Sequence, residues 1–311
     1  MKKKLKLFII GSSLFTVAIL MGRCGTESEA TKDADKSETK DADKSEEDIN
    51  NPKDSDESIF IIGGQIFSIP SPVQTAFLIK DVGVAFNSDY INPADNVIKY
   101  SSNFSKALNL GVYGADLGYL TIYEQTDGAL RYLKSVRGLS KDLGLEGAFD
   151  EKLADRFSSN IGNQDSMLVF VSDAYRNSDK YLKENDKNDI AALVLAGGWI
   201  ESIYIAADAA ISSNNSLLIE RLGDQKKPLA SLIAMLGQYN SDSNYEDLIN
   251  ELENLHAIFE EIKYTYEYVP STTDESKKET TIKSKHTVEI ADGDLEAIIE
   301  KIKSIRTEIV E

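Results

Sequence analysis

Cysteine and histidine are nearly absent from this chain, and the shortage limits the chemistry open to it. Cys24 is the only cysteine in 311 residues, and there are two histidines. No internal disulfide can form, so the folded part has to be stabilised by packing alone. The sequence also lacks the G-x-S-x-G, H-E-x-x-H, P-loop and dinucleotide-binding motifs. These absences remove the best-marked classes of hydrolase, metalloprotease and nucleotide-binding enzyme.

Positive charge is also in short supply. The chain has 34 Lys and Arg against 52 Asp and Glu, which gives a formal net charge of −18. Proteins that bind the nucleic-acid backbone need clustered Lys and Arg, so we expect no nucleic-acid partner. We also expect no helix beyond the N-terminal region to carry the basic amphipathic face of a membrane-surface protein.

The N-terminal region is the exception to this shortage of positive charge. An uncharged run at residues 7–22 follows four basic residues, Lys2, Lys3, Lys4 and Lys6. A basic start followed by a short apolar run is typical of a secretory signal peptide. The run is shorter than the roughly 20 residues that a membrane-spanning helix needs, so a signal peptide is favoured over a permanent span.

The run ends in Leu20-Met21-Gly22-Arg23-Cys24-Gly25, which resembles a bacterial lipoprotein signal. In that class the cysteine becomes the first mature residue and carries the lipid, with acyl chains such as palmitate. The resemblance covers residues 1–25 and implies a signal peptide at 1–23 and lipid attachment at Cys24. It also implies a protein held at a membrane of the bacterial cell envelope, in the periplasm or at the cell surface. An uncleaved N-terminal anchor and a soluble secreted form are the alternatives.

Residues 24–58 predict a disordered acidic tether. The segment has no aromatic residue, and it repeats the octapeptide TKDADKSE at 31–38 and 39–46. So little apolar surface cannot offset the entropy lost on ordering. The repeated aspartates lack the glycine and the final glutamate of a calcium-binding loop. We therefore interpret this segment as a solvated spacer.

Helical periodicity dominates residues 59–311, so we predict a mostly α fold, a multi-helix bundle. One long segment, 92–143, contains Gly111 and Gly138, where we expect it to bend or break. Residues 188–212 are apolar nearly all the way round, which is typical of a helix in the middle of a bundle. Asp292 or Asp294 is expected to cap the last helix. The other expected helices are 69–86, 149–162, 164–185, 228–239, 244–264 and 295–310.

A small β-hairpin is predicted near the C-terminus, at about residues 264–290. The stretches 264–269 and 283–290 alternate with period two and are rich in β-branched and aromatic residues. A polar segment separates them. The three tyrosines of the first stretch, Tyr264, Tyr266 and Tyr268, would share one face, which has to pack on the helices or on a partner.

A stripe of glycines is a candidate for close approach. Gly111, Gly114 and Gly118 fall at i, i+3 and i+7, and each costs about 1 kcal/mol relative to Ala inside a helix. Either the stripe packs against another helix, such as Ala196, Gly197 and Gly198, or a ligand lies along it. The aromatics nearby fit the wall of a binding pocket or an ordinary core equally; they are Tyr113, Tyr119, Tyr123, Trp199 and Tyr204.

Three carboxylates could carry chemistry. Glu201 and Asp208 lie two turns apart on the apolar segment 188–212, and Asp116 stands between the glycines. They could act as acid and base if they converge, or they could form the narrow polar edge of a central helix. The candidate ligand-binding residues are Tyr113, Gly114, Asp116, Gly118, Tyr119, Trp199, Glu201 and Asp208.

Metal binding is not expected. Glu253, His256 and Glu260 could offer three ligands from one helix face, but bundle metal sites draw ligands from several helices. We therefore predict no metal and no cofactor. The sequence favours a lipid-anchored, non-catalytic envelope protein whose helical domain binds a partner protein or small ligand. A carboxylate-dependent hydrolase and a structural assembly subunit are the alternatives.

Overall fold

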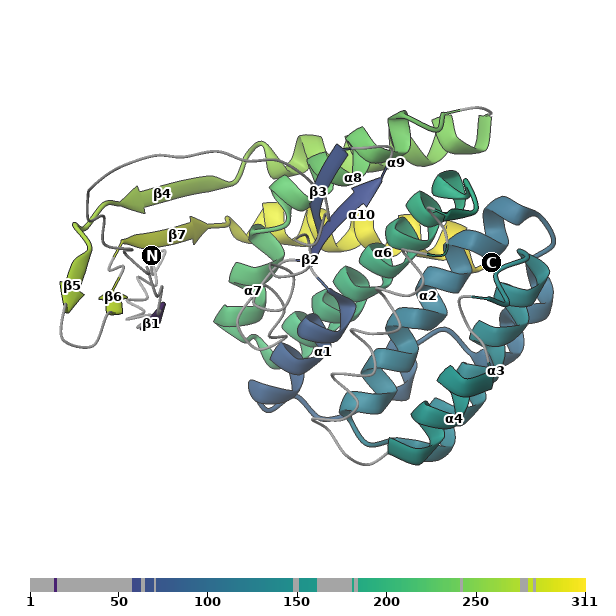
Figure 1. Cartoon of the computed structure of the whole chain (residues 1–311). Helices are drawn as coiled ribbons and strands as arrows, with labels where there is room; N and C mark the ends of the chain where they lie inside the picture. Colours follow the sequence, from purple (N-terminus) through teal and green to yellow (C-terminus); the bar gives the residue numbers. More distant parts are fainter. Residues whose placement is uncertain are drawn as a thin grey trace, which may run out of the picture. The chain divides into compact units, whose positions relative to one another are not determined.

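The computed structural model describes residues 14–15, 58–62, 65–69, 71–147, 151–160, 181, 184–240, 243–274, 279–281 and 284–311. Cys24, most of the predicted tether and most of the expected helix 164–185 lie outside these residues. The fold is mostly α-helical with a small β-hairpin near the C-terminus, as predicted (Figure 1). The chain divides into two units, Asn50–Lys263 with Glu289–Glu311, and Met1–Ile49 with Tyr264–Val288.

Two long helices form the centre of the larger unit. They are α2 (Asn103–Ile122) and α6 (Asn188–Ser213), which pack against each other more extensively than any other pair of described elements. Helix α6 is buried on almost all sides, as its apolar sequence predicts. It is long and apolar enough to cross a membrane, but 78% of its most apolar window is buried inside the protein. That burial fits the middle of a bundle.

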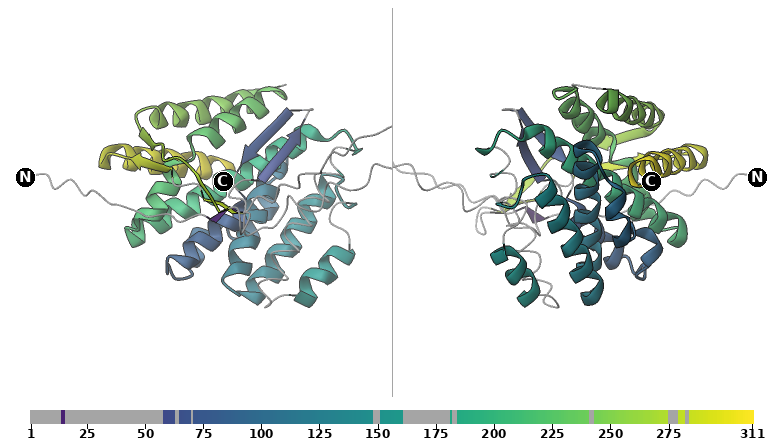
Figure 2. Two further views of the ribbon diagram at one scale, coloured as in Figure 1. Left: turned by 60° about the vertical axis from the view of Figure 1, so that its left-hand side comes forward. Right: turned by 90° about the vertical axis from the view of Figure 1, so that its right-hand side faces the viewer.

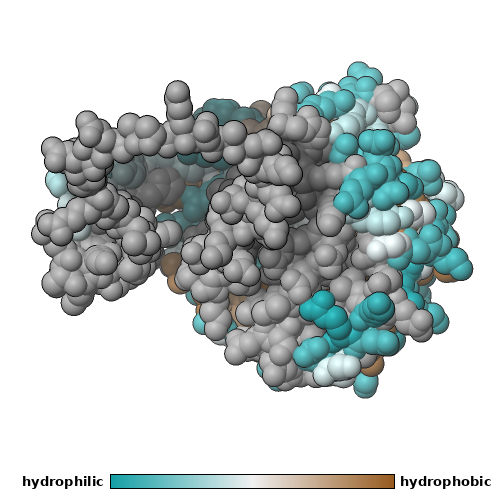
Figure 3. Space-filling model, viewed as in Figure 1, coloured by the Kyte–Doolittle hydropathy of each residue, from teal (hydrophilic) through white to brown (hydrophobic). Residues whose placement is uncertain are grey.

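The remaining helices surround this central pair (Figures 1 and 2). Helices α1, α3 and α10 pack on α2 or α6, while α8 and α9 pack on each other and α9 also contacts α10. Their bounds are α1 Pro72–Asp81, α3 Thr126–Asp142, α4 Glu151–Asn160, α7 Ser216–Gly223, α8 Lys226–Gly237, α9 Ser243–Phe259 and α10 Asp292–Val310. The coloured surface on the side of α3 is mostly hydrophilic (Figure 3).

The long segment 92–143 breaks at a different place from the one expected. Gly111 and Gly138 lie inside α2 and α3, and the chain turns between the two helices at Tyr123–Gln125. Glu124 occupies the left-handed region there, with φ of 58°. The expectation was wrong because a helix tolerates glycine wherever packing stabilises it. The predicted cap of α10 is wrong as well, since its N-cap residue is Ala291.

A second hairpin was not predicted at all. Strands β2 (Ser58–Ile62) and β3 (Gln65–Ile69) pair antiparallel, with Ile62 opposite Gln65. This register leaves a two-residue connection, Gly63-Gly64. A Gly-Gly pair between two apolar stretches is a sequence signal for a β-hairpin, because glycine adopts positive φ without strain. The dipeptide between two apolar stretches was therefore the missed signal.

The smaller unit contains the predicted hairpin. Strands β4 (Lys263–Glu267) and β7 (Lys285–Glu289) pair, close to the predicted stretches. Between them β5 (Thr272–Asp274) pairs antiparallel with β6 (Glu279–Thr281), which also pairs with β1 (Leu14–Phe15). Tyr266 and Tyr268 are 66% and 72% exposed. The described part of this hairpin thus presents aromatic side chains to solvent.

Candidate functional site

A buried charged cluster joins three helices of the bundle. Asp116 from α2, Glu201 from α6 and Arg306 from α10 meet in the core, where both carboxylates are fully buried. The Arg306 guanidinium donates to Glu201 through two hydrogen bonds, Nε to Oε2 at 3.0 Å and Nη2 to Oε1 at 2.9 Å. This paired geometry is the strongest form of an Arg–carboxylate contact. The cluster is therefore a fixed part of the core.

The two carboxylates influence each other's ionisation. Burial, and secondly the negative charge of Glu201, raise the pKa of Asp116 well above its usual range, while Arg306 opposes the shift. Burial also raises the pKa of Glu201, and the hydrogen bonds and charge of Arg306 oppose that shift. One guanidinium cannot neutralise two buried carboxylates. We infer that Asp116 holds a proton and that Glu201 is the ionised partner of Arg306.

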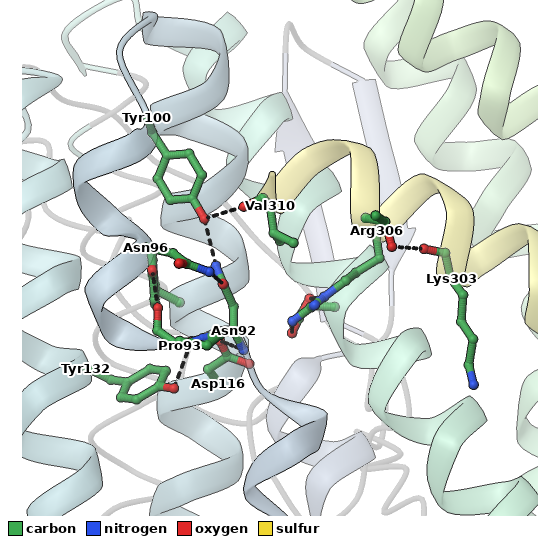
Figure 4. A network of polar contacts seen from close by, with 12 residues as sticks. Asn92, Pro93, Asn96, Tyr100, Asp116, Tyr132, Lys303, Arg306 and Val310 are labelled. Carbon is green, nitrogen blue, oxygen red and sulfur yellow. Dashed lines mark hydrogen bonds and ion pairs between the residues drawn. The ribbon is translucent and has the colours of Figure 1, made fainter.

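Asn92 extends this cluster into a wider network of buried hydrogen bonds (Figure 4). Its N–H donates to Asp116 Oδ2 at 3.1 Å, and its carbonyl accepts from the Tyr132 hydroxyl at 2.7 Å. The Asn92 side chain donates to the Tyr100 oxygen at 2.8 Å, and Tyr100 donates to the Val310 carbonyl at 3.2 Å. No described group donates to the other oxygen of Asp116, Oδ1. A proton on Asp116 would let this oxygen donate to the neighbouring Glu201.

Asp208 takes a separate partner at the edge of the cluster. Its Oδ1 lies 2.5 Å from Lys303 Nζ, and its side chain is 17% exposed. The Arg306 guanidinium carbon lies 4.5 Å from the centre of the Tyr204 ring, within the range of a cation–π contact. Helix α10 thus supplies a cation to each of Glu201 and Asp208 of α6.

A groove lies on the other side of the Asn92 loop. It encloses about 710 Å³ and is bordered by the loop between α1 and α2 and by the α2–α3 turn. Tyr132 belongs to both features, because its ring lines the groove while its hydroxyl bonds Asn92. Its lining includes Phe86, Ile91, Ala94, Asp95, Leu120, Asp127 and Arg131.

The structure places most of the predicted ligand-binding residues in the core. The side chains of Tyr113, Asp116, Tyr119 and Glu201 are fully buried, and Trp199 is 2% exposed. They make internal contacts: Trp199 Nε1 donates to Gln225 Oε1 at 3.1 Å, Tyr113 donates to the Pro93 carbonyl at 2.9 Å, and Tyr119 accepts from the Asn87 N–H at 3.1 Å. None of the predicted set lines the groove described above.

The glycine stripe divides into three different environments. A Cβ at Gly111 would overlap the Val194 carbonyl and the Gly198 nitrogen of α6, so this glycine permits the close crossing of α2 and α6. Gly118 faces Val73 of α1, and Gly114 has no atom within 4 Å of an added Cβ. The helix-packing interpretation therefore holds for Gly111 and its contact with α6.

Among the described residues, no group of three or more His, Cys, Asp or Glu could hold a metal ion. His256 Nδ1 lies 3.7 Å from Glu260 Oε1, and the other oxygen of Glu260 pairs with Lys226 at 2.9 Å. The carboxylate is thus already engaged by Lys226, which does not suit a metal ligand.

Two features escaped sequence reasoning. Arg306 was missed because a basic residue in an amphipathic helix is expected to lie at the surface. Only its proximity to Glu201 in the fold shows that it pairs with a buried carboxylate. The outer face of α3 was also missed: Arg131, Lys134, Arg137 and Lys141 are all exposed. The other side of α3 packs into the core and offers no apolar face to a membrane, so the expectation of no membrane-surface amphipathic helix stays a prediction. The four basic residues are spread over eleven positions, and the nearby Asp127 and Asp142 lower the net charge of the segment, so no basic cluster stands out in the sequence.

No protein-family model, curated protein or solved structure matches this chain.

Proposed function

We propose that this chain is a lipid-anchored bacterial envelope protein whose helical domain binds a partner protein or small ligand without catalysis. The lipid on Cys24 holds it at a membrane, and residues 24–58 act as a tether. The domain works in the periplasm or at the cell surface. A carboxylate-dependent hydrolase and a structural assembly subunit are the competing functions.

The burial of the candidate acid–base residues is the observation that carries this proposal. A catalytic carboxylate has to reach the bond that it acts on, at hydrogen-bond distance or through one water. Asp116 and Glu201 are fully buried, and Glu201 is engaged by Arg306 through two hydrogen bonds. Asp208 is paired with Lys303. The three carboxylates therefore support a role in holding α2, α6 and α10 together, which argues against the hydrolase.

The groove supports a binding role. Its volume lies within the usual range for small-ligand sites, roughly 300–1,000 Å³, and its lining combines apolar side chains with polar and charged ones. Phe86, Ile91 and Leu120 supply apolar surface, while Asp127 and Arg131 offer groups that fix orientation. The exposed Tyr266 of β4 and Tyr268, which follows that strand, offer a second contact surface for a partner protein.

The anchor is tested by mass spectrometry of the N-terminus of protein purified from its own bacterium. The expected product starts at Cys24 with acyl chains attached, and the Cys24→Ala variant should lack them. Recovery of a chain that retains Lys2 to Lys6, or of an unmodified Cys24, would contradict the lipid anchor.

The binding surfaces are tested by site-specific photocrosslinking in living cells. A photoreactive residue at Ala94 samples the groove and one at Tyr268 samples the hairpin, while Lys227, exposed on α8, is the matched control position. We expect a defined adduct from the first or second position and none from the control. Equal adducts from all three positions, or none, would contradict a dedicated binding surface.

A further inference from the structure

The outer face of α3 concentrates positive charge in a strongly acidic protein. Lys134, Arg137 and Lys141 occur at i, i+3 and i+7, so they project from the same side of the helix. All three are exposed, and the opposite side of α3 packs into the core through Tyr132, Val136 and Leu139 among others. We call these three residues the basic face. The coloured surface on the side of α3 is mostly hydrophilic (Figures 1 and 3).

The charges of the basic face are not neutralised by ion pairs within the described part of the protein. No described carboxylate oxygen forms an ion pair with Lys134, Arg137 or Lys141, whereas the neighbouring Asp142 pairs with Lys106 of α2 at 2.8 Å. The nearest acid in line with the face on the same helix is Asp127, two turns before Lys134. The basic face thus remains available for an anion from outside.

The predicted anchor and tether indicate what that anion is. A flexible spacer of this length has a root-mean-square reach on the order of 30 Å, so a chain held by a lipid at Cys24 stays close to the membrane. Anchoring raises the effective concentration of headgroups around the domain, so a weak electrostatic contact becomes sufficient. Stable membrane attachment commonly combines a lipid with a basic patch.

We propose that the basic face binds the anionic headgroups of the membrane to which the chain is anchored, and thereby orients the helical domain on its surface. This proposal rests on the proposed function for the source of the headgroups. Each Lys or Arg near an anionic surface contributes roughly a fivefold gain in affinity. Three such residues together raise the affinity on the order of 100-fold. No apolar side chain of α3 inserts into the membrane, because the apolar side of this helix faces the core. The contact is therefore salt-sensitive.

The test uses lipid-free protein that starts at residue 24, with Cys24→Ser, so that the acyl chains cannot drive binding. Cosedimentation is measured with vesicles of phosphatidylcholine alone and with vesicles containing 30% phosphatidylglycerol, at low and at high salt. We expect binding only to the anionic vesicles at low salt. The triple variant Lys134→Gln, Arg137→Gln, Lys141→Gln should bind them about 100-fold more weakly.

The matched control removes the same three charges from other helices and strands. Lys152, Lys227 and Lys263 are exposed on α4, α8 and β4, and their combined change to Gln should alter binding only a few-fold. Circular dichroism verifies that both variants fold. Equal binding of the two triple variants, or no wild-type preference for anionic vesicles, overturns the proposal. It is overturned equally if a peptide of residues 26–57, and not the vesicle, occupies the basic face. The N-terminal mass measurement is independent, so failure of the anchor and failure of the basic face are distinguishable.

Discussion

One methyl group placed at Gly111 should weaken the fold, whereas the same methyl group one turn later should strengthen it. In Gly111→Ala the new Cβ would overlap two backbone atoms of α6, the Val194 carbonyl oxygen and the Gly198 nitrogen. Backbone atoms cannot rotate away as a side chain can, so the two helices have to move apart. In Gly114→Ala the new Cβ meets no atom within 4 Å.

The magnitudes follow from two opposing effects. Replacing Gly by Ala in a helix interior stabilises the helix by about 1 kcal/mol. Overpacking a well-filled interface costs about 1–3 kcal/mol, and overlap with backbone belongs at the upper end. The net change in the free energy of unfolding is therefore a loss of about 2 kcal/mol for Gly111→Ala and a gain of up to about 1 kcal/mol for Gly114→Ala.

Urea unfolding and thermal unfolding, both followed by circular dichroism at 222 nm, measure the two variants against the wild type. For a domain of this size the expected changes in Tm are a decrease of about 4–8 °C for Gly111→Ala and a small increase for Gly114→Ala. Gly197→Ala is a second test of the same contact, because its Cβ would overlap the Leu108 carbonyl of α2. Equal stability of Gly111→Ala and Gly114→Ala would contradict a close crossing of α2 and α6 at Gly111.

The buried charged cluster gives two further predictions, both read from unfolding curves. Arg306→Gln leaves Glu201 buried without its partner and should lower the free energy of unfolding by about 3–5 kcal/mol. Arg306→Met combined with Glu201→Gln removes both charges and should recover part of this loss. A double variant no more stable than Arg306→Gln would contradict the pairing of Arg306 with Glu201. Because the pKa of Asp116 is raised in the folded protein, its contribution to stability is complete below the unfolded pKa of about 4 and is lost as the pH rises through the folded value. Asp116→Asn should therefore reduce the loss of stability as the pH rises above about 4. The exposed control Asp95→Asn should show the same dependence of stability on pH as the wild type. The same dependence in all three proteins would contradict a buried, protonated Asp116.

The sequence by itself determined the class of fold and the position of α6. A helix that is apolar on every side has no surface to present to water, so it has to lie inside. The same local patterns indicated the hairpin near the C-terminus, because period-two alternation is a property of neighbouring residues. The Gly63-Gly64 dipeptide was an equally local signal, and the pairing of β2 with β3 could have been predicted from it.

Only the tertiary structure decided which polar residues meet. Glu201 and Arg306 are 105 residues apart, and nothing in the periodicity of α10 distinguishes Arg306 from a solvated basic residue. The glycines of α2 look alike in the sequence, yet one contacts backbone and another faces open space. Local patterns arise from the geometry of a single helix, whereas contacts between helices depend on how each is rotated and positioned against its neighbours. That arrangement is fixed by the packing of the whole core.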